Sequence, residues 1–297
     1  MTRTVALWLA LCVAVLAACS DDTPALDGGA RDQRAEGAAS DATPPDAITP
    51  DTTSPPAARC AAGSRAGAAG STDGHQTATG LGYNVRTPPG YDPTVGHPLI
   101  VVFAGAGGSA GTMEPYTGLT NPALAAGYII AYADHVSPLS YKGVEDLATI
   151  PGDIAATWCV DKARIYLTGH SDGGSVIYIG LFRGYFAATP PAAIAPSAAG
   201  INAAVLANAP CPAPPLPVMV LHASNDTLFP GFGREALAFW NACYQCSVTT
   251  TADLQGCVRQ SGCGPGADVR FCETDGGHGG WPAKNDAMLA FFGQHRR

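Results

Sequence analysis

The sequence predicts a domain of the α/β class, in which a mainly parallel sheet carries helices on both faces. Two observations predict it. Short, continuous apolar runs are typical of strands that are buried on both faces, and these runs alternate with stretches of helical pattern. Such alternation is typical of parallel strands joined by crossover helices. The 36 glycines and 25 prolines supply turns between the elements, and a hydrophobic fraction of 46% is enough to build a core.

The expected elements follow one another from residue 83 to the end of the chain. An edge strand is expected over 83–87, where apolar and polar residues alternate before Pro88 and Pro89. Further strands are expected over 98–103, 128–132, 164–168, 192–199, 218–221 and 269–272. Helices are expected over 111–126, 145–158, 174–186, 232–243 and 283–295.

The first 18 residues have the pattern of a secretory signal peptide. Arg3 precedes an apolar run over 5–18, which is shorter than the roughly 20 residues of a membrane-spanning helix. The run ends in Leu-Ala-Ala-Cys19, which resembles the bacterial lipobox. In that kind of signal the cysteine becomes lipidated and forms the new N-terminus. We therefore expect export and a lipid anchor on Cys19; an ordinary signal peptide with an incidental cysteine is the alternative.

Residues 19–59 are expected to form a disordered tether behind the lipidated cysteine. From residue 20 to 59 the chain holds eight acidic residues, three arginines and six prolines, with no aromatic residue. Such a composition buries too little apolar surface to offset the entropy lost on folding. The folded domain is therefore expected over 60–297.

Eight cysteines lie beyond the lipobox, and in an exported chain they are candidates for up to four disulfides. Their spacing leaves the pairing open. Cys243 and Cys246 also match a redox or zinc pair, which Cys257 and Cys263 could complete, but an oxidising compartment favours disulfides. The candidates are Cys60, Cys159, Cys211, Cys243, Cys246, Cys257, Cys263 and Cys272.

The charge of the expected folded domain is low and mixed. Residues 60–297 hold 12 basic and 16 acidic residues, out of a net charge of −8 for the whole chain. No basic stripe of the kind that binds nucleic acid is apparent. We therefore expect no nucleic-acid partner, and no membrane contact other than the lipid anchor.

The most informative motif is Gly169-His-Ser171-Asp-Gly173, a G-x-S-x-G sequence. An expected strand leads directly into it and an expected helix leads out, which is the setting of a nucleophile elbow. Such a turn lifts the serine hydroxyl above the sheet, and the flanking glycines leave room for the neighbouring backbone. A simple Gly-Ser turn is the alternative. The motif predicts Ser171 as a nucleophile.

A serine hydroxyl needs a base to accept its proton and an acid to orient that base, in the chain order serine, acid, histidine. Asp226 follows the strand expected at 218–221, and His278 follows the last strand in a glycine-rich loop. We predict these two as the acid and the base. Asp172 and Asp275 are poorer candidates for the acid.

A developing oxyanion needs backbone N–H donors. We expect one from Asp172, the residue after the serine, and a second from the loop after Phe103, with Ala106 preferred over Gly105. The same loop nearly matches a dinucleotide-binding fingerprint, with Asp134 as its acidic residue. However, its last glycine is replaced by alanine, so no cofactor is expected.

Several strings together resemble the extracellular esterases of the polyhydroxybutyrate depolymerase, feruloyl esterase and acetylxylan esterase type, which have the α/β-hydrolase fold. The resemblance begins near residue 83 and implies that nucleophile, acid and base fall on Ser171, Asp226 and His278, the positions already reached from order and spacing. The strings that carry it are 83–91, 98–103, 127–132, 159–171, Trp240 with Cys246, and Gly277-His278 with Trp281-Pro282.

Two departures from that group stand in the predicted site. Ala104 replaces a histidine that usually follows the first buried strand, and Gly279-Gly280 makes the loop after His278 one residue longer than usual. The resemblance implies hydrolysis of small or polymeric carboxylic esters, for which a serine triad needs no metal or cofactor. We expect a monomer outside the cytoplasm, which is either anchored through Cys19 or secreted. A peptidase on the same fold, or an inactive surface-binding lipoprotein, are the alternatives.

Overall fold

The computed structural model describes residues 58–247, 249–253 and 256–297. The expected signal peptide, Cys19 and the tether up to residue 57 lie outside these residues. The described residues group into one compact unit. Within the described ranges, no helix combines the length and the apolar character needed to cross a bilayer.

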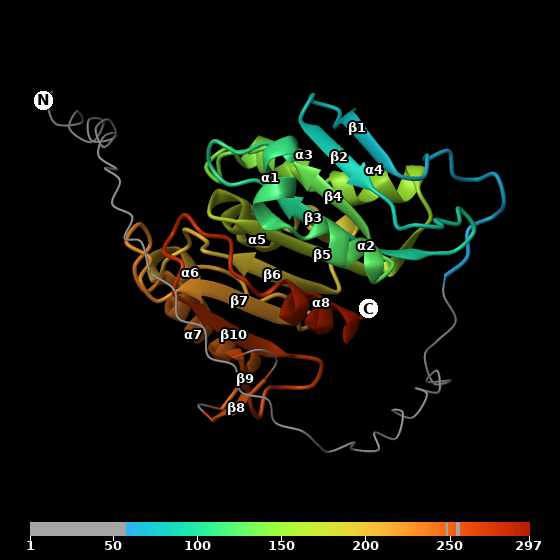
Figure 1. Ribbon diagram of the computed structural model, residues 1–297. Coiled ribbons are helices and arrows are strands. Elements are labelled where there is room, and N and C mark those ends of the chain that lie inside the picture. The colour runs from blue at the N-terminus through green and yellow to red at the C-terminus, as the bar shows by residue number, and fades with distance from the viewer. Residues whose placement is uncertain (1–57, 248, 254–255) are drawn as a thin grey trace, which may run out of the picture. The chain divides into compact units, whose positions relative to one another are not determined.

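The domain is built on a ten-stranded sheet with the order β1-β2-β4-β3-β5-β6-β7-β10-β9-β8 (Figure 1). The strands from β4 through β10 in this order are parallel to one another. Antiparallel strands extend the sheet at both ends. The strands are β1 Ser71–Gln76, β2 Gly82–Arg86, β3 His97–Phe103, β4 Ile129–Ala133, β5 Val160–His170, β6 Ala193–Ser197, β7 Val218–Ala223, β8 Thr250–Ala252, β9 Val258–Gln260 and β10 Val269–Thr274.

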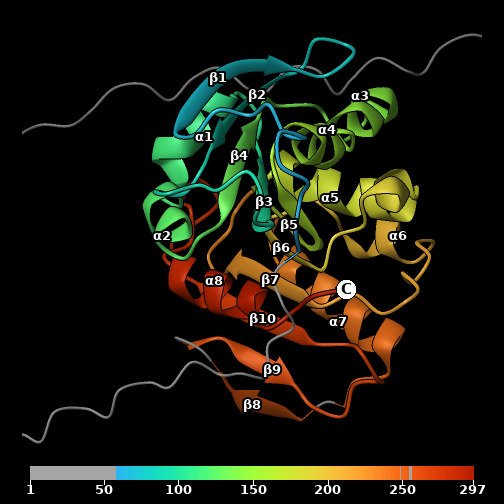
Figure 2. The same ribbon diagram turned by 90° about the vertical axis from the view of Figure 1, so that its right-hand side faces the viewer.

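Helices cover both faces of the sheet, as Figure 2 shows in a view along it. Helices α1, α2 and α8 lie on one face, and α3 to α7 lie on the other. A short 3₁₀ helix, Tyr185–Ala188, follows α5. The helices are α1 Ala110–Thr117, α2 Thr120–Ala125, α3 Tyr141–Leu147, α4 Ile150–Thr157, α5 Asp172–Phe182, α6 Ala203–Leu206, α7 Phe232–Tyr244 and α8 Asn285–Gly293.

The parallel strands contribute side chains to two separate hydrophobic clusters, one on each face of the sheet. In β3, Leu99, Val101 and Phe103 belong to the cluster under α4, α5 and α7. Ile100 and Val102 belong to the cluster under α1, α2 and α8. Successive side chains of a strand point to opposite faces, so a strand covered on both faces must be apolar at every position. The predicted α/β-hydrolase fold and its buried strands are confirmed.

The structure corrects three of the expected elements. The helix expected over 111–126 is two helices, because Gly118 adopts the left-handed conformation (φ 58°) and ends α1. The helix expected over 145–158 is likewise divided into α3 and α4. The strand expected at the edge of the sheet is not an edge, because β2 pairs with β1 as well as with β4.

The eight predicted cysteines form four disulfides, Cys60–Cys159, Cys211–Cys243, Cys246–Cys263 and Cys257–Cys272. The four thiols considered as a redox or metal set are therefore divided among three disulfides. Cys243 and Cys246 bind different partners, so they do not form a redox pair with each other. The cysteines of the first disulfide are 99 residues apart, and the bond ties the start of the described chain to the residue before β5.

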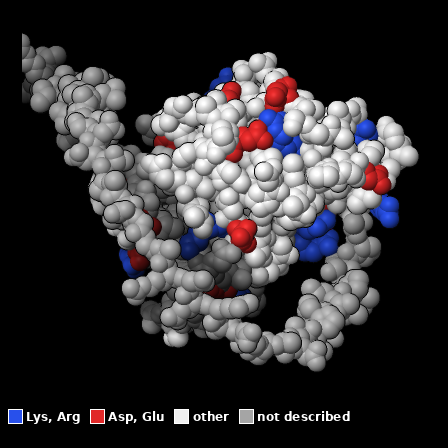
Figure 3. Space-filling view, in the orientation of Figure 1, with Lys and Arg blue, Asp and Glu red and all other residues white. Residues whose placement is uncertain are grey.

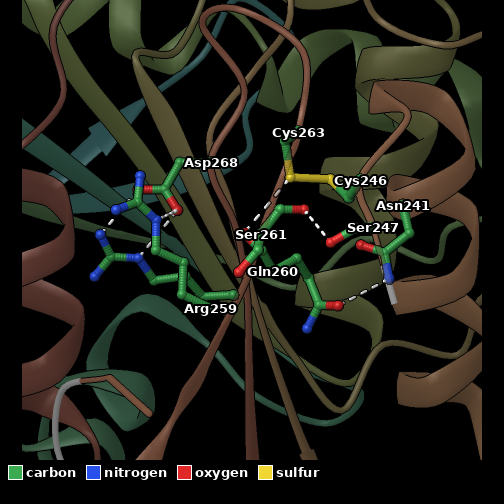
Figure 4. Close-up of a disulfide and its surroundings, with 9 residues drawn as sticks. Asn241, Cys246, Ser247, Arg259, Gln260, Ser261, Cys263 and Asp268 are labelled. Carbon is green, nitrogen blue, oxygen red and sulfur yellow. Dashed lines mark hydrogen bonds and ion pairs between the residues drawn. A yellow bond between two sulfur atoms is a disulfide. The ribbon is translucent and has the colours of Figure 1, made fainter. Parts of the chain in front are cut away.

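One disulfide joins the end of α7 to the turn after β9 (Figure 4). Next to it, Ser247 Oγ donates to the carbonyl of Ser261 at 2.9 Å. Asn241 of α7 donates to the side-chain oxygen of Gln260 at 3.1 Å. The β8–β9 hairpin has few apolar residues of its own, so these cross-links fasten it to the core.

We predict that the disulfide with the longest loop contributes most to stability. The denatured-state entropy removed by a cross-link grows with loop length, to about 4.7 kcal/mol for a loop of about 100 residues and about 3 kcal/mol for one of about 15. The double variant Cys60→Ala/Cys159→Ala should therefore lose more free energy of unfolding than Cys257→Ala/Cys272→Ala, whose cysteines are 15 residues apart. Guanidinium unfolding measures both; an equal loss, or the reverse order, contradicts the prediction.

Candidate active site

Ser171 lies on a sharp turn between β5 and α5. Its backbone has φ 56° and ψ −116°, a region that side-chain-bearing residues rarely occupy. Its N–H donates to the carbonyl of Ser197 on β6 at 2.9 Å, and its carbonyl accepts from Ser175 in α5. The turn is thus held from the sheet and from the helix, which is the expected form of a nucleophile elbow.

The glycines of the motif allow the elbow to touch the end of β3. A Cβ atom on Gly169 would lie 2.8 Å from the carbonyl oxygen of Phe103 and 2.6 Å from the backbone of Gly173. A Cβ atom on Gly173 would overlap that same carbonyl group. Only glycine fits at either position, because the neighbour is backbone and has no freedom to move aside.

The side chains of Ser171, His278 and Asp226 form one hydrogen-bonded chain. Ser171 Oγ lies 2.9 Å from His278 Nε2, and His278 Nδ1 lies 2.8 Å from Asp226 Oδ2. The three residues follow β5, β10 and β7. All three strands are parallel, so their carboxyl ends lie at the same edge of the sheet.

Asp226 is held as a buried carboxylate. Its side chain is 1% exposed, and its Oδ1 accepts the N–H groups of Leu228 and Phe229, each at 2.9 Å. Burial alone would raise the pKa of Asp226, but these hydrogen bonds and the one from His278 outweigh it and hold the pKa below its usual value. The carboxylate is therefore ionised at neutral pH and is able to orient the imidazole.

The start of α5 and the loop after β3 both lie beside Ser171. Asp172 is the first residue of α5, where N–H groups have no partner within the helix. Gly105 packs against the elbow, because a Cβ there would lie 3.4 Å from the Cβ of Ser171. Gly108 donates to the carbonyl of Gly105 at 2.9 Å, which folds the loop containing Ala106 into a tight turn.

A cavity of about 530 Å³ opens over the serine. None of the described residues that line it is Lys, Arg, Asp or Glu, so it suits an uncharged group. The lining residues are Gly105, Ala106, Gly107, Gly108, Thr112, Met113, Tyr116, His170, Ser171, Leu228, His278 and Gly279. On the face of the domain seen in Figure 3, acidic and basic residues are scattered and mixed.

His170, the last residue of β5, contacts the backbone of His278. Its Nε2 is 2.7 Å from the backbone carbonyl of His278, and its Nδ1 is 3.1 Å from Ser197 Oγ. Burial lowers its pKa to about 4. Order along the chain gave no signal for this contact, because it depends on how the loop at 275–282 folds back.

Two residues that the sequence analysis singled out, Ala104 and Asp134, have structural roles. Ala104 is 2% exposed and belongs to the cluster under α1 and α8, with its side chain away from solvent. Asp134, the acidic residue of the near-match to a dinucleotide fingerprint, accepts the backbone N–H groups of Ala110 at 2.9 Å and Gly82 at 3.1 Å. Both of its oxygens are thus used within the fold.

Comparison with known proteins agrees with this architecture. The chain is 26% identical over 233 residues to feruloyl esterase C of Emericella nidulans, covering 74% of this chain and 84% of that protein. It is 26% identical to a probable feruloyl esterase C of Aspergillus terreus, covering 71% of this chain and 81% of that protein. No protein-family model matches the chain.

Solved structures show the same fold at lower identity. The acetyl xylan esterase from Aspergillus awamori has a TM-score of 0.54 and 15% identity, with 76% of this chain and 99% of that chain covered. The feruloyl esterase module from Clostridium thermocellum, complexed with sinapinate, has a TM-score of 0.54 and 14% identity, with 75% of this chain and 86% of that chain covered.

The structure and these similarities define the class of fold: the chain has an α/β-hydrolase fold. Within that class, the resemblance to the feruloyl and acetylxylan esterases is confirmed, and the protein is a carboxylic ester hydrolase.

We predict that Gly173→Ala damages the site. The added methyl would meet the Phe103 carbonyl and force backbone movement, which typically costs about 1–3 kcal/mol. A displacement of the serine by about 1 Å is expected to lower kcat about 100-fold. The matched control is Gly111→Ala in α1, where a Cβ meets nothing within 4 Å. If both variants retain the activity and melting temperature of the parent, the close contact is not a constraint.

A second prediction concerns the stability of the domain in acid. The pKa of His170 is about 4 in the folded protein and about 6.5 in an unfolded chain. Between these values the unfolded chain binds more protons, so stability falls as pH falls from about 6.5 to about 4. His170→Gln should remove this part of the slope, worth up to about 3 kcal/mol. Denaturant unfolding across this pH range measures it; parallel curves for parent and variant would disprove it.

Proposed function

We propose that the protein hydrolyses carboxylic esters through a Ser171-His278-Asp226 triad. The observation that carries the proposal is the continuous hydrogen-bonded chain of these three side chains, formed by residues 52 or more positions apart in the sequence. A positioned imidazole makes a serine hydroxyl a competent nucleophile, because it accepts the proton as the new bond forms.

In this mechanism Ser171 Oγ attacks the ester carbonyl carbon while its proton passes to His278 Nε2. The tetrahedral intermediate collapses, the bond from carbon to the alcohol oxygen breaks, and the alcohol leaves with the proton from His278. Water then attacks the acyl-enzyme, His278 accepts its proton, and that proton returns to Ser171 as the acid leaves. Asp226 keeps the imidazole in the required tautomer and stabilises its charged form.

The N–H groups of Asp172 and Ala106, with Gly105 as the alternative second donor, are proposed to stabilise the oxyanion. This is supported by the position of Asp172 at the start of α5 and of Gly105 and Ala106 on the wall of the cavity. The positive end of the helix dipole points toward the same place.

The substrates are proposed to be esters with an uncharged acyl group, of the kind named in the similar proteins: feruloyl esters and acetylated xylan, or polyhydroxybutyrate as the earlier resemblance implies. The uncharged lining of the cavity supports this. No metal or cofactor is part of the mechanism, since nucleophile, base and oxyanion donors are all supplied by the chain.

The protein is proposed to act outside the cytoplasm, after removal of residues 1–18 and lipidation of Cys19, as a monomer. Four disulfides support export, because such bonds persist in oxidising compartments. The tether over 19–59 would then separate the domain at 60–297 from the membrane.

The test measures hydrolysis of nitrophenyl, feruloyl, acetyl-sugar and hydroxybutyrate esters. Ser171→Ala should lower kcat at least about 10⁴-fold and abolish labelling by a fluorophosphonate. Asp226→Asn should lower kcat about 10⁴-fold, because the wrong imidazole tautomer is favoured. The control Asp275→Asn changes an exposed carboxylate in the loop that carries His278, and its kcat should stay within about threefold of the parent.

The outcomes separate the alternatives. A parent protein that is neither labelled nor active on any ester contradicts the proposal and favours a binding protein. Faster cleavage of peptide amides than of esters favours a peptidase. Unchanged ester hydrolysis in Ser171→Ala would show that the nucleophile lies elsewhere.

A further inference from the structure

The loop that carries His278 is rich in glycine. Residues 275–282 contain Gly276, Gly277, Gly279 and Gly280, and Gly277 has φ 65°. Glycine has the greatest backbone freedom of any residue, so ordering such a loop loses more entropy than ordering an ordinary one. Yet a proton transfer requires His278 Nε2 to stay within hydrogen-bond reach of Ser171 Oγ. Something outside the loop has to hold it.

Three side chains from three different parts of the fold bind backbone groups of three consecutive residues in this loop. Asn225, in the loop after β7, accepts the N–H of Gly277 at 2.9 Å. His170, at the end of β5, binds the carbonyl of His278 at 2.7 Å. Tyr116, on α1, donates its hydroxyl to the carbonyl of Gly279 at 3.2 Å. The contacts thus fall on residues 277, 278 and 279 in order.

We propose that His170, Tyr116 and Asn225 form a clamp that positions His278 for proton transfer, an inference that rests on the proposed function. None of the three is proposed to exchange protons with the substrate. They act through His278, because holding its own carbonyl and backbone groups of the residues on either side, Gly277 and Gly279, restricts where its imidazole points.

The hydrogen-bond pattern indicates which ring nitrogen of His170 carries the proton. A carbonyl oxygen only accepts, so Nε2 carries the proton and donates to His278. Nδ1 then accepts from the hydroxyl of Ser197 on β6, whose backbone carbonyl also holds the elbow. One buried imidazole therefore connects β6, the neighbour of the strand that leads to Ser171, to the loop that carries His278.

Aromatic packing supports the same arrangement. The His170 ring lies 5.5 Å from the Tyr116 ring and 6.3 Å from the Trp281 ring, centroid to centroid. Trp281 is anchored in turn, because its Nε1 donates to Asn285 at the start of α8 at 2.8 Å. The far end of the glycine-rich loop is therefore fixed as well.

The clamp gives a physical role to the extra glycine noted in the sequence. Gly279-Gly280 lengthens the segment between His278 and Trp281 by one residue relative to the group that the chain resembles. A longer glycine segment leaves the imidazole less restricted by the covalent chain alone. The Tyr116 hydroxyl binds at Gly279, within this longer segment.

The experiment compares Tyr116→Phe, His170→Phe and His170→Gln in the full chain. Loss of one donor should lower kcat about 10-fold in Tyr116→Phe, and loss of the central donor about 100-fold in His170→Phe, since small misplacements of a catalytic group are costly. His170→Gln restores an N–H donor and should recover about 10-fold of that loss. Because Tyr116 and His170 also line the cavity, each variant is tested on an acetyl and on a feruloyl ester.

The matched control is Tyr166→Phe, which removes another phenol-to-carbonyl hydrogen bond, to His295 at 2.7 Å, away from the site. It should reduce thermal stability but leave kcat within about twofold. A second readout does not depend on activity: hydrogen exchange in peptide 275–282 should be about 10-fold faster in His170→Phe, and unchanged in Tyr166→Phe.

Equal fold-losses for both esters, faster exchange, and partial rescue by glutamine support the clamp. Losses confined to one ester would instead indicate a change of pocket shape, and unchanged exchange with normal kcat would overturn the proposal. If the parent is inactive or Ser171→Ala retains activity, the proposed function fails, while the exchange measurement still tests whether the three side chains hold the loop.

Discussion

A backbone-to-backbone contact between the end of β3 and the elbow after β5 is the constraint on which the site depends. Gly169 and Gly173 lie against the carbonyl group of Phe103 with no room for a Cβ atom. This close approach sets the height and direction of the turn at Ser171, whose φ of 56° is one that few side-chain-bearing residues adopt. The Ser171 backbone is therefore strained, and the neighbouring strands β3 and β6 hold the turn in this conformation.

The rest of the site follows from strand direction. Because β5, β7 and β10 run parallel, the loops that follow them leave at one edge of the sheet. Asp226 and His278 are thus brought to Ser171 by the sheet and not by any proximity in sequence. Hydrogen bonds from the backbone N–H groups of Leu228 and Phe229 then fix the Asp226 carboxylate. The carboxylate in turn orients the His278 imidazole.

The parts of the fold that could be predicted are those in which the residue types alone indicate burial or a tight turn. Strands buried on both faces are apolar throughout, and the elbow needs its glycines. By contrast, β1 and β8 are polar and largely exposed, and β9 has only three residues, so their sequences resemble loops. The disulfide pairing and the contact of His170 with the His278 carbonyl depend on distances between remote segments, which no local pattern encodes.

The polar hairpins at the two ends of the sheet have a consequence for crowding. The outermost strands, β1 Ser71–Gln76 and the three-residue β8 Thr250–Ala252, offer neighbouring copies short, hydrophilic borders in place of the apolar parallel strands inside. Exposed strand borders are where separate molecules join into aggregates, and short polar ones resist this. Even when many copies lie close together on a surface, these polar edge strands would thus keep the domains from joining their sheets edge to edge.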